Sequence, residues 1–214
     1  MTASSQNLTN HVVVWKHGVF PKQATRALAS WEQFHTVLFT DDHCGSLARQ
    51  WGCGGYFRTD LMNITRADIC RYMATWDAGG VYSDLDVNLL RKFDARCSDL
   101  CVAREFADGK HYGNHFFIAA RQSPCLQRAI RHSCQRAMRT HMDFRIDPHV
   151  IHHIAGPYAF DKAVRGCAAQ MSRPAPFYTH HLHASVNWHR PGLYNGWMHE
   201  RMKRAKWTHV YQHR

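Results

Sequence analysis

Alternating blocks of apolar and polar residues predict strands and helices that follow one another along the chain. Short apolar runs, several of them rich in β-branched residues, predict strands at 11–15, 35–42, 81–87 and 115–120. Helical spacing of apolar residues predicts helices at 21–34, 65–78 and 123–140. Strands and helices that alternate in this way are typical of an α/β fold, in which helices flank a mostly parallel central sheet.

The helix predicted over 65–78 has polar residues on a face of their own. Thr65 and Asp68 have the spacing of a capping box, and Arg71 falls one turn after Asp68. The helix is expected to end at Gly79 and Gly80, because glycine readily adopts the left-handed conformation of a C-terminal cap. The apolar stripe, expected to face the core, comprises Ile69, Tyr72, Met73 and Trp76.

The strand predicted over 81–87 carries two aspartates one residue apart. Side chains alternate along a strand, so Asp84 and Asp86 should share a face with Tyr82, their α-carbons ~7 Å apart. Two carboxylates on one face repel each other unless a cation lies beside them. Mg²⁺ and Mn²⁺ prefer oxygen ligands and often bridge a carboxylate to substrate phosphates. The pattern predicts a divalent metal site. Its simpler alternatives are two solvated aspartates and, for Asp68 and Arg71, a surface ion pair.

Composition fits one soluble domain spanning 1–214 with a basic surface. The chain has 214 residues, of which 45% are hydrophobic, and 27 Lys and Arg against 16 Asp and Glu give a net charge of +11. Such a surface attracts polyanions. An anionic membrane surface or a phosphorylated acceptor is the partner that the basic stretches at 128–139 and in the tail, 198–214, predict. No nucleic-acid partner is expected.

The location and redox state of the chain can also be predicted. No apolar run approaches the ~20 residues of a membrane span, and the N-terminus lacks the pattern of a secretory signal. A soluble, cytoplasmic protein is therefore expected. The 8 cysteines have no tight, framework-like spacing, so reduced thiols are expected as well.

The stretch 66–87 resembles the sugar-binding D-x-D region of a group of glycosyltransferases. The group includes yeast-type initiating mannosyltransferases, bacterial capsular-polysaccharide transferases and the glucosylating domain of large clostridial toxins. Its shared pattern is an Asp and an Arg on a helix, followed by Gly-Gly-x-Tyr-x-Asp-x-Asp. The matching residues here are Asp68, Arg71, Gly79, Gly80, Tyr82, Asp84 and Asp86.

The resemblance extends more weakly over most of the stretch from Val12 to Trp188. It includes the first predicted strand with its Trp and the end of the second, which reads "LFTDD". It also includes the segment in which Asn114 precedes an apolar strand. Ala155 stands where the group usually has Thr in a "TGP" segment. Val186 and Asn187 precede Trp188 where "GSW" is usual, so this ending departs from the pattern and does not identify the third metal ligand.

The resemblance implies a GT-A type fold and transfer of a sugar from a nucleotide diphosphate sugar, UDP-linked in preference, to a glycan or other acceptor. The implied reaction retains the anomeric configuration and uses Mn²⁺ or Mg²⁺. The implied catalytic residues are Asp84, Asp86, Asp68 and Arg71. The implied donor-binding residues are Val14, Trp15, Thr40, Asp68, Arg71, Tyr82, Asp84, Asn114 and Trp188. The implied metal ligands are Asp86 and His183, or alternatively His181, with Asp84 acting through a water.

A phosphatase is one alternative to a transferase. Asp84 and Asp86 also match the D-x-D opening of aspartyl-phosphate hydrolases. Those enzymes need an apolar strand just before the first Asp and an acidic pair downstream. Here "GGVYS" precedes Asp84, and no acidic pair was found after Asp86.

A basic zinc module that binds nucleic acid without catalysis is the other alternative. Cys97, Cys101, His111 and His115 approach the spacing of a zinc finger. The gap between the two pairs is shorter than the ~12 residues that such fingers need. The simpler interpretation of the two cysteines is that they are small core residues.

Overall fold

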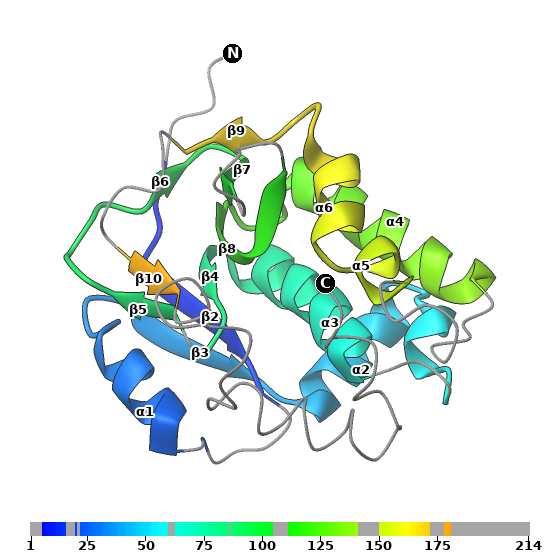
Figure 1. Ribbon diagram of the computed structural model, residues 1–214, viewed down its shortest axis with the longest axis horizontal. Helices are drawn as coiled ribbons and strands as arrows, with labels where there is room; N and C mark the ends of the chain where they lie inside the picture. The colour runs from blue at the N-terminus through cyan, green and yellow to red at the C-terminus, as the bar shows by residue number, and fades with distance from the viewer. Residues whose placement is uncertain are drawn as a thin grey trace, which may run out of the picture.

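A computed structural model describes residues 6–15, 20, 22–59, 63–85, 87–104, 111–140, 150–171 and 178–180. A central sheet runs through the molecule, and most helices lie together on one of its faces (Figure 1). The helices are α1 (Lys22–Ala29), α2 (Asp41–Gln50), the short 3-10 helix η1 (Gly54–Phe57), α3 (Asn63–Ala78), α4 (Pro124–Arg139), α5 (Val150–Ile154) and α6 (Pro157–Val164).

The six-stranded central sheet has the order β3-β2-β4-β8-β7-β9. Its strands are β2 (Asn10–Val14), β3 (His35–Phe39), β4 (Gly80–Ser83), β7 (Leu100–Arg104), β8 (Tyr112–Ala119) and β9 (Ala169–Gln170). β2 pairs in parallel with β3 and β4, and β7 with β9, whereas β8 runs antiparallel to β4 and β7. The predicted α/β class with a mostly parallel sheet is confirmed.

Two short ladders lie beside this sheet. β1 (Gln6–Asn7) pairs with β6 (Arg96–Cys97), and β5 (Val87–Leu89) pairs with β10 (Tyr178–His180). Both ladders are antiparallel. They lie on the side of the sheet away from α4 (Figure 1).

Side chains that alternate along the strands of the sheet pack into two separate apolar cores, one on each face. Val12, Tyr82 and Phe117 point toward α3, α4 and α6, in a core that also holds Phe160. Their neighbours Val81 and Phe116 point the other way and pack with residues after α1 and along β5. This alternation follows from the period of two along a strand. The sheet is therefore covered on both faces, as parallel sheets usually are.

Helix α3 is buried almost all round, which an amphipathic pattern does not predict. Ile69, Tyr72 and Met73 are fully buried as expected, but Asp68 and Arg71 on the other face are only 6% and 7% exposed. A surface ion pair is thus excluded. The predicted capping box is wrong because the helix begins at Asn63, which places Thr65 inside it. The glycine cap is confirmed: Gly79 and Gly80 have φ values of 65° and 125°.

Strand β4 is shorter than predicted, and Asp84 lies in the turn that follows it. The strand ends at Ser83, and the backbone N–H of Val87 donates to the carbonyl oxygen of Asp84 at 3.0 Å, closing a tight turn. The prediction of one continuous strand over 81–87 is therefore wrong. Asp84 still shares a side with Tyr82, as predicted, and Asp86 itself lies outside the described residues.

All eight cysteines form disulfides, so the expectation of reduced thiols is wrong. The pairs are Cys44–Cys70, Cys53–Cys134, Cys97–Cys101 and Cys125–Cys167. Their α-carbons are 5.2 to 6.0 Å apart, as is usual for disulfides. Sequence spacing failed here because three of the four bridges join cysteines 26 or more residues apart, which only the fold brings together. A disulfide between Cys97 and Cys101 also removes the two thiolates that a zinc finger would need.

Among the described residues, no helix combines the length and the apolar character that crossing a bilayer requires.

Candidate functional site

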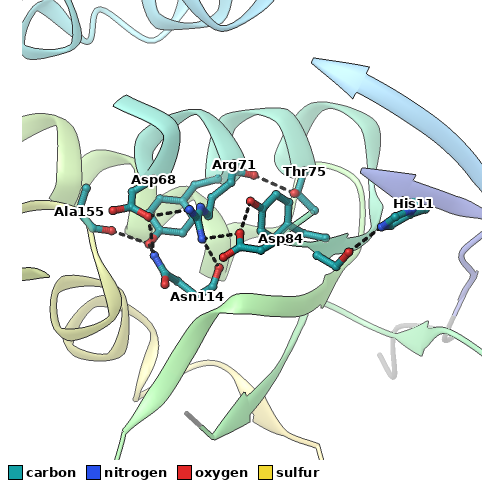
Figure 2. A network of polar contacts seen from close by, with 10 residues as sticks. His11, Asp68, Arg71, Thr75, Asp84, Asn114 and Ala155 are labelled. Carbon is teal, nitrogen blue, oxygen red and sulfur yellow. Dashed lines mark hydrogen bonds and ion pairs between the residues drawn. The ribbon is translucent and has the colours of Figure 1, made fainter. Parts of the chain in front are cut away.

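The site is built around Arg71, whose guanidinium bonds three groups from three different elements. Its Nη2 lies 2.9 Å from Oδ1 of Asp68 on the same helix, and its Nη1 lies 2.9 Å from Oδ1 of Asp84 after β4. Nη1 also donates to the carbonyl oxygen of Asn114 on β8 at 2.9 Å. Figure 2 shows these groups converging between α3 and the sheet. The planar, multidonor guanidinium is suited to holding two carboxylates apart at fixed positions.

Asn114 and Tyr72 extend this network toward α5 and α6. The amide of Asn114 donates to Oδ1 of Asp68 at 3.0 Å and lies 2.9 Å from the hydroxyl of Tyr72. That hydroxyl donates in turn to the carbonyl oxygen of Ala155, at the corner between α5 and α6 (Figure 2). The sequence pattern had placed Tyr72 in the core, which is correct for its ring, but its hydroxyl is a structural part of the site.

Asp84 is held by a second donor besides Arg71. The hydroxyl of Tyr82 donates to Oδ1 of Asp84 at 2.7 Å, and the Arg71 guanidinium carbon lies 5.2 Å from the centre of the Tyr82 ring. The backbone N–H of Asp84 donates to the carbonyl oxygen of His115 at 2.9 Å. With 19% of its side chain exposed, Asp84 is the more accessible of the two carboxylates that Arg71 bonds.

Burial sets the protonation of the site, and neighbouring charges modify it. Burial raises the pKa of Asp68 from 3.8 to about 6, while Arg71 and Asn114 act to lower this pKa and Asp84 adds to its rise. Burial by itself would lower the pKa of Arg71, but Asp84, Tyr82 and Asp68 outweigh it and hold that pKa well above its ordinary value. Burial also raises the pKa of Tyr82, so its hydroxyl stays protonated and remains a donor.

A buried histidine fixes the opposite side of β4. Nε2 of His11 lies 2.7 Å from the hydroxyl oxygen of Ser83, and its ring stacks on Trp31 with the centroids 4.2 Å apart. Burial lowers the pKa of His11 to about 3, so the ring stays neutral and cannot act as a cation beside Asp84. His11 therefore anchors the strand end from which Asp84 projects, a role that no sequence pattern predicted.

A hollow of about 580 Å³ opens where β2 ends, near the start of α3. Its aromatic lining is Trp15 from the end of β2 and Tyr56 and Phe57 from η1, and Arg49 and Arg66 bring positive charge. The remaining lining residues are Val14, Asp41, Asp42, Gly45, Ser46, Asn63, Ala67 and Cys70. The disulfide between Cys44 and Cys70 joins α2 to α3 at this hollow. A second hollow, of about 540 Å³, includes Leu8 and Thr9, which precede β2, and therefore lies at the opposite edge of the sheet.

The structure brings together most of the predicted site residues that it describes. Asp68, Arg71, Tyr82, Asp84 and Asn114 form the bonded network, whereas Val14 and Trp15 line the hollow. Thr40 immediately precedes α2 and its backbone N–H donates to Nδ1 of His43 at 3.3 Å; its neighbours, not Thr40 itself, line the hollow. The remaining predictions, Asp86, His181, His183 and Trp188, lie outside the described residues.

Sequence reasoning missed the wall of the hollow that α2 and η1 supply. The pattern predicted only a polar turn after the strand at 35–42, but Asp41 and Asp42 open a helix. The signal for that helix was present: Thr40 stands at the N-cap position and two acidic residues follow in the first turn.

The described residues supply only part of the ligand set that a divalent metal needs. No group of three or more His, Cys, Asp or Glu side chains able to hold a metal occurs within the described ranges. Oδ1 of Asp84 is already engaged by Arg71 and Tyr82. A carboxylate neutralised in this way suits a water-mediated contact with a cation better than direct ligation. The oxygen chemistry of Asp84 nevertheless fits Mn²⁺ or Mg²⁺.

Comparison with known proteins shows which family the first part of the chain resembles. Residues 2–103 match the family model described as "Glycosyltransferase sugar-binding region containing DXD motif". The predicted resemblance is thereby confirmed: residues 2–103 are similar to the DXD-containing sugar-binding region of these glycosyltransferases. The matched region includes Asp68, Arg71, Tyr82 and Asp84, whereas Asn114, the remaining member of the bonded network, lies beyond it.

Two individual proteins support the same family and fold. The chain is 26% identical over 127 residues, 55% of its length, to inositol phosphoceramide mannosyltransferase 1 of Schizosaccharomyces pombe. The match spans only 40% of that curated relative. The fold is similar to that of a solved structure, PaToxG Glycosyltransferase, with a TM-score of 0.56 and 14% identity, covering 75% of this chain and 69% of that one. The expected glycosyltransferase fold is therefore confirmed.

Proposed function

We propose that this chain transfers a sugar from a nucleotide diphosphate sugar, with UDP as the nucleotide, to a glycan or other acceptor, with retention of configuration. The observation that carries the proposal is the buried bridge that Arg71 forms between Asp68 and Asp84, 2.9 Å from each. The family match over residues 2–103 supports it, because the bridge connects the residues that define the sugar-binding pattern. It also favours a transferase over the phosphatase alternative.

The bridge suits recognition of a donor sugar. Carboxylates accept hydrogen bonds from sugar hydroxyls, and the guanidinium of Arg71 and the amide of Asn114 donate to them. Asp68, Arg71 and Asn114 are mutually bonded and 5–7% exposed, so their positions are set before a ligand arrives. Groups that are fixed in advance cost little further reorganisation in the transition state.

The hollow beside β2 suits the nucleotide. Its volume of about 580 Å³ falls in the ~300–1,000 Å³ range of small-molecule sites. Trp15, Tyr56 and Phe57 offer aromatic surface for a base, and Arg49 and Arg66 offer positive charge for a diphosphate. Ala67 lines the hollow next to Asp68, so a nucleotide there would extend its sugar toward the Arg71 bridge.

Neutralisation of the diphosphate leaving group is the chemistry that bound Mn²⁺ or Mg²⁺ supplies in such a reaction. We assign direct ligation to Asp86 and to His183, with His181 as the alternative. Asp84 would contact the metal through a water, since Arg71 and Tyr82 already bond its Oδ1. Trp188 would close over the diphosphate.

Disulfides change the location that we propose for the chain. Bridges persist in oxidising compartments and are rare in the cytosol. With all eight cysteines paired, an oxidising compartment fits better than the cytoplasm expected from the sequence. Donor and acceptor would have to be supplied there.

A donor-hydrolysis and transfer assay tests the proposed function. UDP- and GDP-linked sugars are incubated with Mn²⁺, and mannose is included because the curated relative is named a mannosyltransferase. We expect Asp84→Asn to lower the rate at least about 100-fold, as loss of a preorganised charged group commonly does. Asp94→Asn is the matched control, since its side chain is 75% exposed and lies in the β5–β6 segment. Equal rates for the two variants would contradict the proposal.

A further inference from the structure

The outer face of α4 is strongly basic. Arg128, Arg131, Gln135 and Arg139 are exposed at i, i+3, i+7 and i+11, which is one stripe of a helix, and α4 contains no Asp or Glu. The side chains of these three arginines form no hydrogen bond or ion pair with another residue that the structure describes. Within the part of the chain that the structure describes, no side chain neutralises the positive charge of this stripe.

Helix α6 adds a further cation to the basic surface of α4. Burial lowers the pKa of His132, and the positive charges of Arg136 on α4 and Lys162 on α6 lower it further. Both cations therefore lie near His132, where the two helices meet. Asp161 is the acidic residue of α6, and it is 6% exposed and bonded by Arg165 at 2.6 Å. The residues of α4 and α6 themselves therefore bring little negative charge to the surface that these helices share.

Exposed apolar side chains lie at the C-terminal end of this stripe. Met138 on α4 is 49% exposed and Phe57 on η1 is 45% exposed. The two elements pack together: a Cβ added at Gly54 of η1 would lie 3.8 Å from the sulfur of Met138. The guanidinium of Arg49 lies 5.9 Å from the centre of the Phe57 ring. Arginine beside exposed methionine and phenylalanine is a composition suited to a membrane interface.

We propose that this basic face, formed by Arg128, Arg131, Arg139 and Lys162 with Met138 at its end, docks on an anionic lipid bilayer. Its arginines and lysine would lie against anionic headgroups, and the apolar side chain would enter the boundary between headgroups and acyl chains. Nucleic acid would use the same charge but would gain little from an exposed methionine. The apolar end of the stripe therefore favours a bilayer.

The hollow beside β2 lies close to the end of the basic face, which bears on the kind of acceptor that a docked chain could use. Phe57 lines the hollow and belongs to η1, whose Gly54 packs against Met138 at the end of the basic face. Docking would thus bring the mouth of the hollow to the lipid surface, where the headgroup of a lipid could serve as acceptor. This consequence rests on the proposed transferase function, whereas the docking itself does not.

Co-sedimentation with phosphatidylcholine vesicles, with and without phosphatidylserine, tests the docking. We expect the wild-type chain to bind only the anionic vesicles, and the binding to weaken steeply as salt is raised. Each basic side chain near such a surface contributes about five-fold in affinity, so Arg128→Gln/Arg131→Gln/Arg139→Gln should lose about 100-fold. The control Arg91→Gln/Lys92→Gln/Arg96→Gln removes the same charge from exposed positions on or near β5 and β6, across the molecule (Figure 1).

Three results would overturn the docking. One is no binding of the wild-type chain to anionic vesicles at low salt. Another is an equal loss for the control variant, which would make the attraction a property of net charge alone. The third is displacement of the chain from vesicles by single-stranded RNA at an equal concentration of phosphate. Met138→Gln should weaken vesicle binding at high salt, where charge is screened, and unchanged binding there would exclude its proposed insertion. None of these assays requires transferase activity, so they separate docking from the proposed function.

Discussion

Arg71 lies in the middle of α3 and Asp84 follows β4, yet Nη1 of Arg71 is 2.9 Å from Oδ1 of Asp84. The same guanidinium is 2.9 Å from Asp68. Side-chain exposures of 9% for Arg71 and 8% for Asp68 leave little water to solvate these charges. Buried charges are tolerated only when they are paired and hydrogen-bonded. Arg71 should therefore hold both the geometry of the site and part of the stability of the fold.

Replacing Arg71 tests this double role. We expect Arg71→Ala to lower the free energy of unfolding by about 3–5 kcal/mol, because it leaves buried carboxylates without a cation. Urea unfolding measures the change. Lys92→Ala is the control, since Lys92 is 76% exposed and only 3.9 Å from Glu32, and it should cost at most about 1 kcal/mol. Similar losses for both variants would show that the Arg71 bridge adds nothing beyond an exposed pair.

The hydroxyl of Tyr82 gives a narrower test of how Asp84 is positioned. Tyr82→Phe removes the 2.7 Å bond to Asp84 and leaves the ring in the core. Hydrogen bonds to charged groups contribute about 1.5–3 kcal/mol, so we expect donor affinity to fall about tenfold or more. Calorimetric titration with the donor measures it. Tyr158→Phe, at a side chain that is 37% exposed on α6, should leave the affinity unchanged. Unchanged affinity in Tyr82→Phe would mean that Asp84 needs no such donor.

The raised pKa of Asp68 predicts a pH dependence of stability. In the folded chain Asp68 keeps its proton up to a pH of about 6, whereas the unfolded chain releases it near 3.8. The folded state thus binds more protons in this window, so the contribution of Asp68 to stability falls as pH rises from about 4 to about 6. Measured against Asp68→Asn, the wild-type chain should lose stability across this window and show no further change above it. A relative gain with rising pH would show that Arg71, not burial, controls the carboxyl.

The disulfides predict a large dependence on redox state. The bridge between Cys53 and Cys134 spans 81 residues of sequence, and its removal should cost about 2–5 kcal/mol. Thermal unfolding of Cys53→Ala/Cys134→Ala measures this cost. Alkylation of the denatured, unreduced chain provides the independent check. We expect no cysteine to react, and labelling of all eight would refute the four bridges.

The sequence predicted the network of the site better than its surroundings. Asp68, Arg71, Tyr82 and Asp84 were found because their spacing matches a shared pattern, and spacing within a helix and a neighbouring strand is a local property. Asn114 was found through a weaker likeness. Its bond to Asp68 depends on the pairing of β8 with β4, which no local pattern specifies.

Features that depend on distant contacts could not be read from the sequence. Burial of Asp68 and Arg71 arises because β8 and the corner after α5 cover the polar side of α3, so an amphipathic pattern there is misleading. His11 reaches Ser83 only through the parallel pairing of β2 with β4. The cysteine pairs were hidden for the same reason. The end of β4 at Ser83 was missed because Asp84 and Leu85 continue the alternating pattern while the backbone turns.

Metal-dependent binding of a nucleotide sugar tests the central claim most directly. Thermal unfolding is followed with UDP, GDP and their sugars, each with and without Mn²⁺, for the wild-type chain and for Asp84→Asn. A donor present at ~100 times its Kd should stabilise the wild-type chain by about 2.7 kcal/mol. We predict this stabilisation for one nucleotide sugar, only with the metal, and much reduced in Asp84→Asn. No metal-dependent stabilisation by any of these nucleotides would contradict the assignment of the Arg71 bridge as a nucleotide-sugar site.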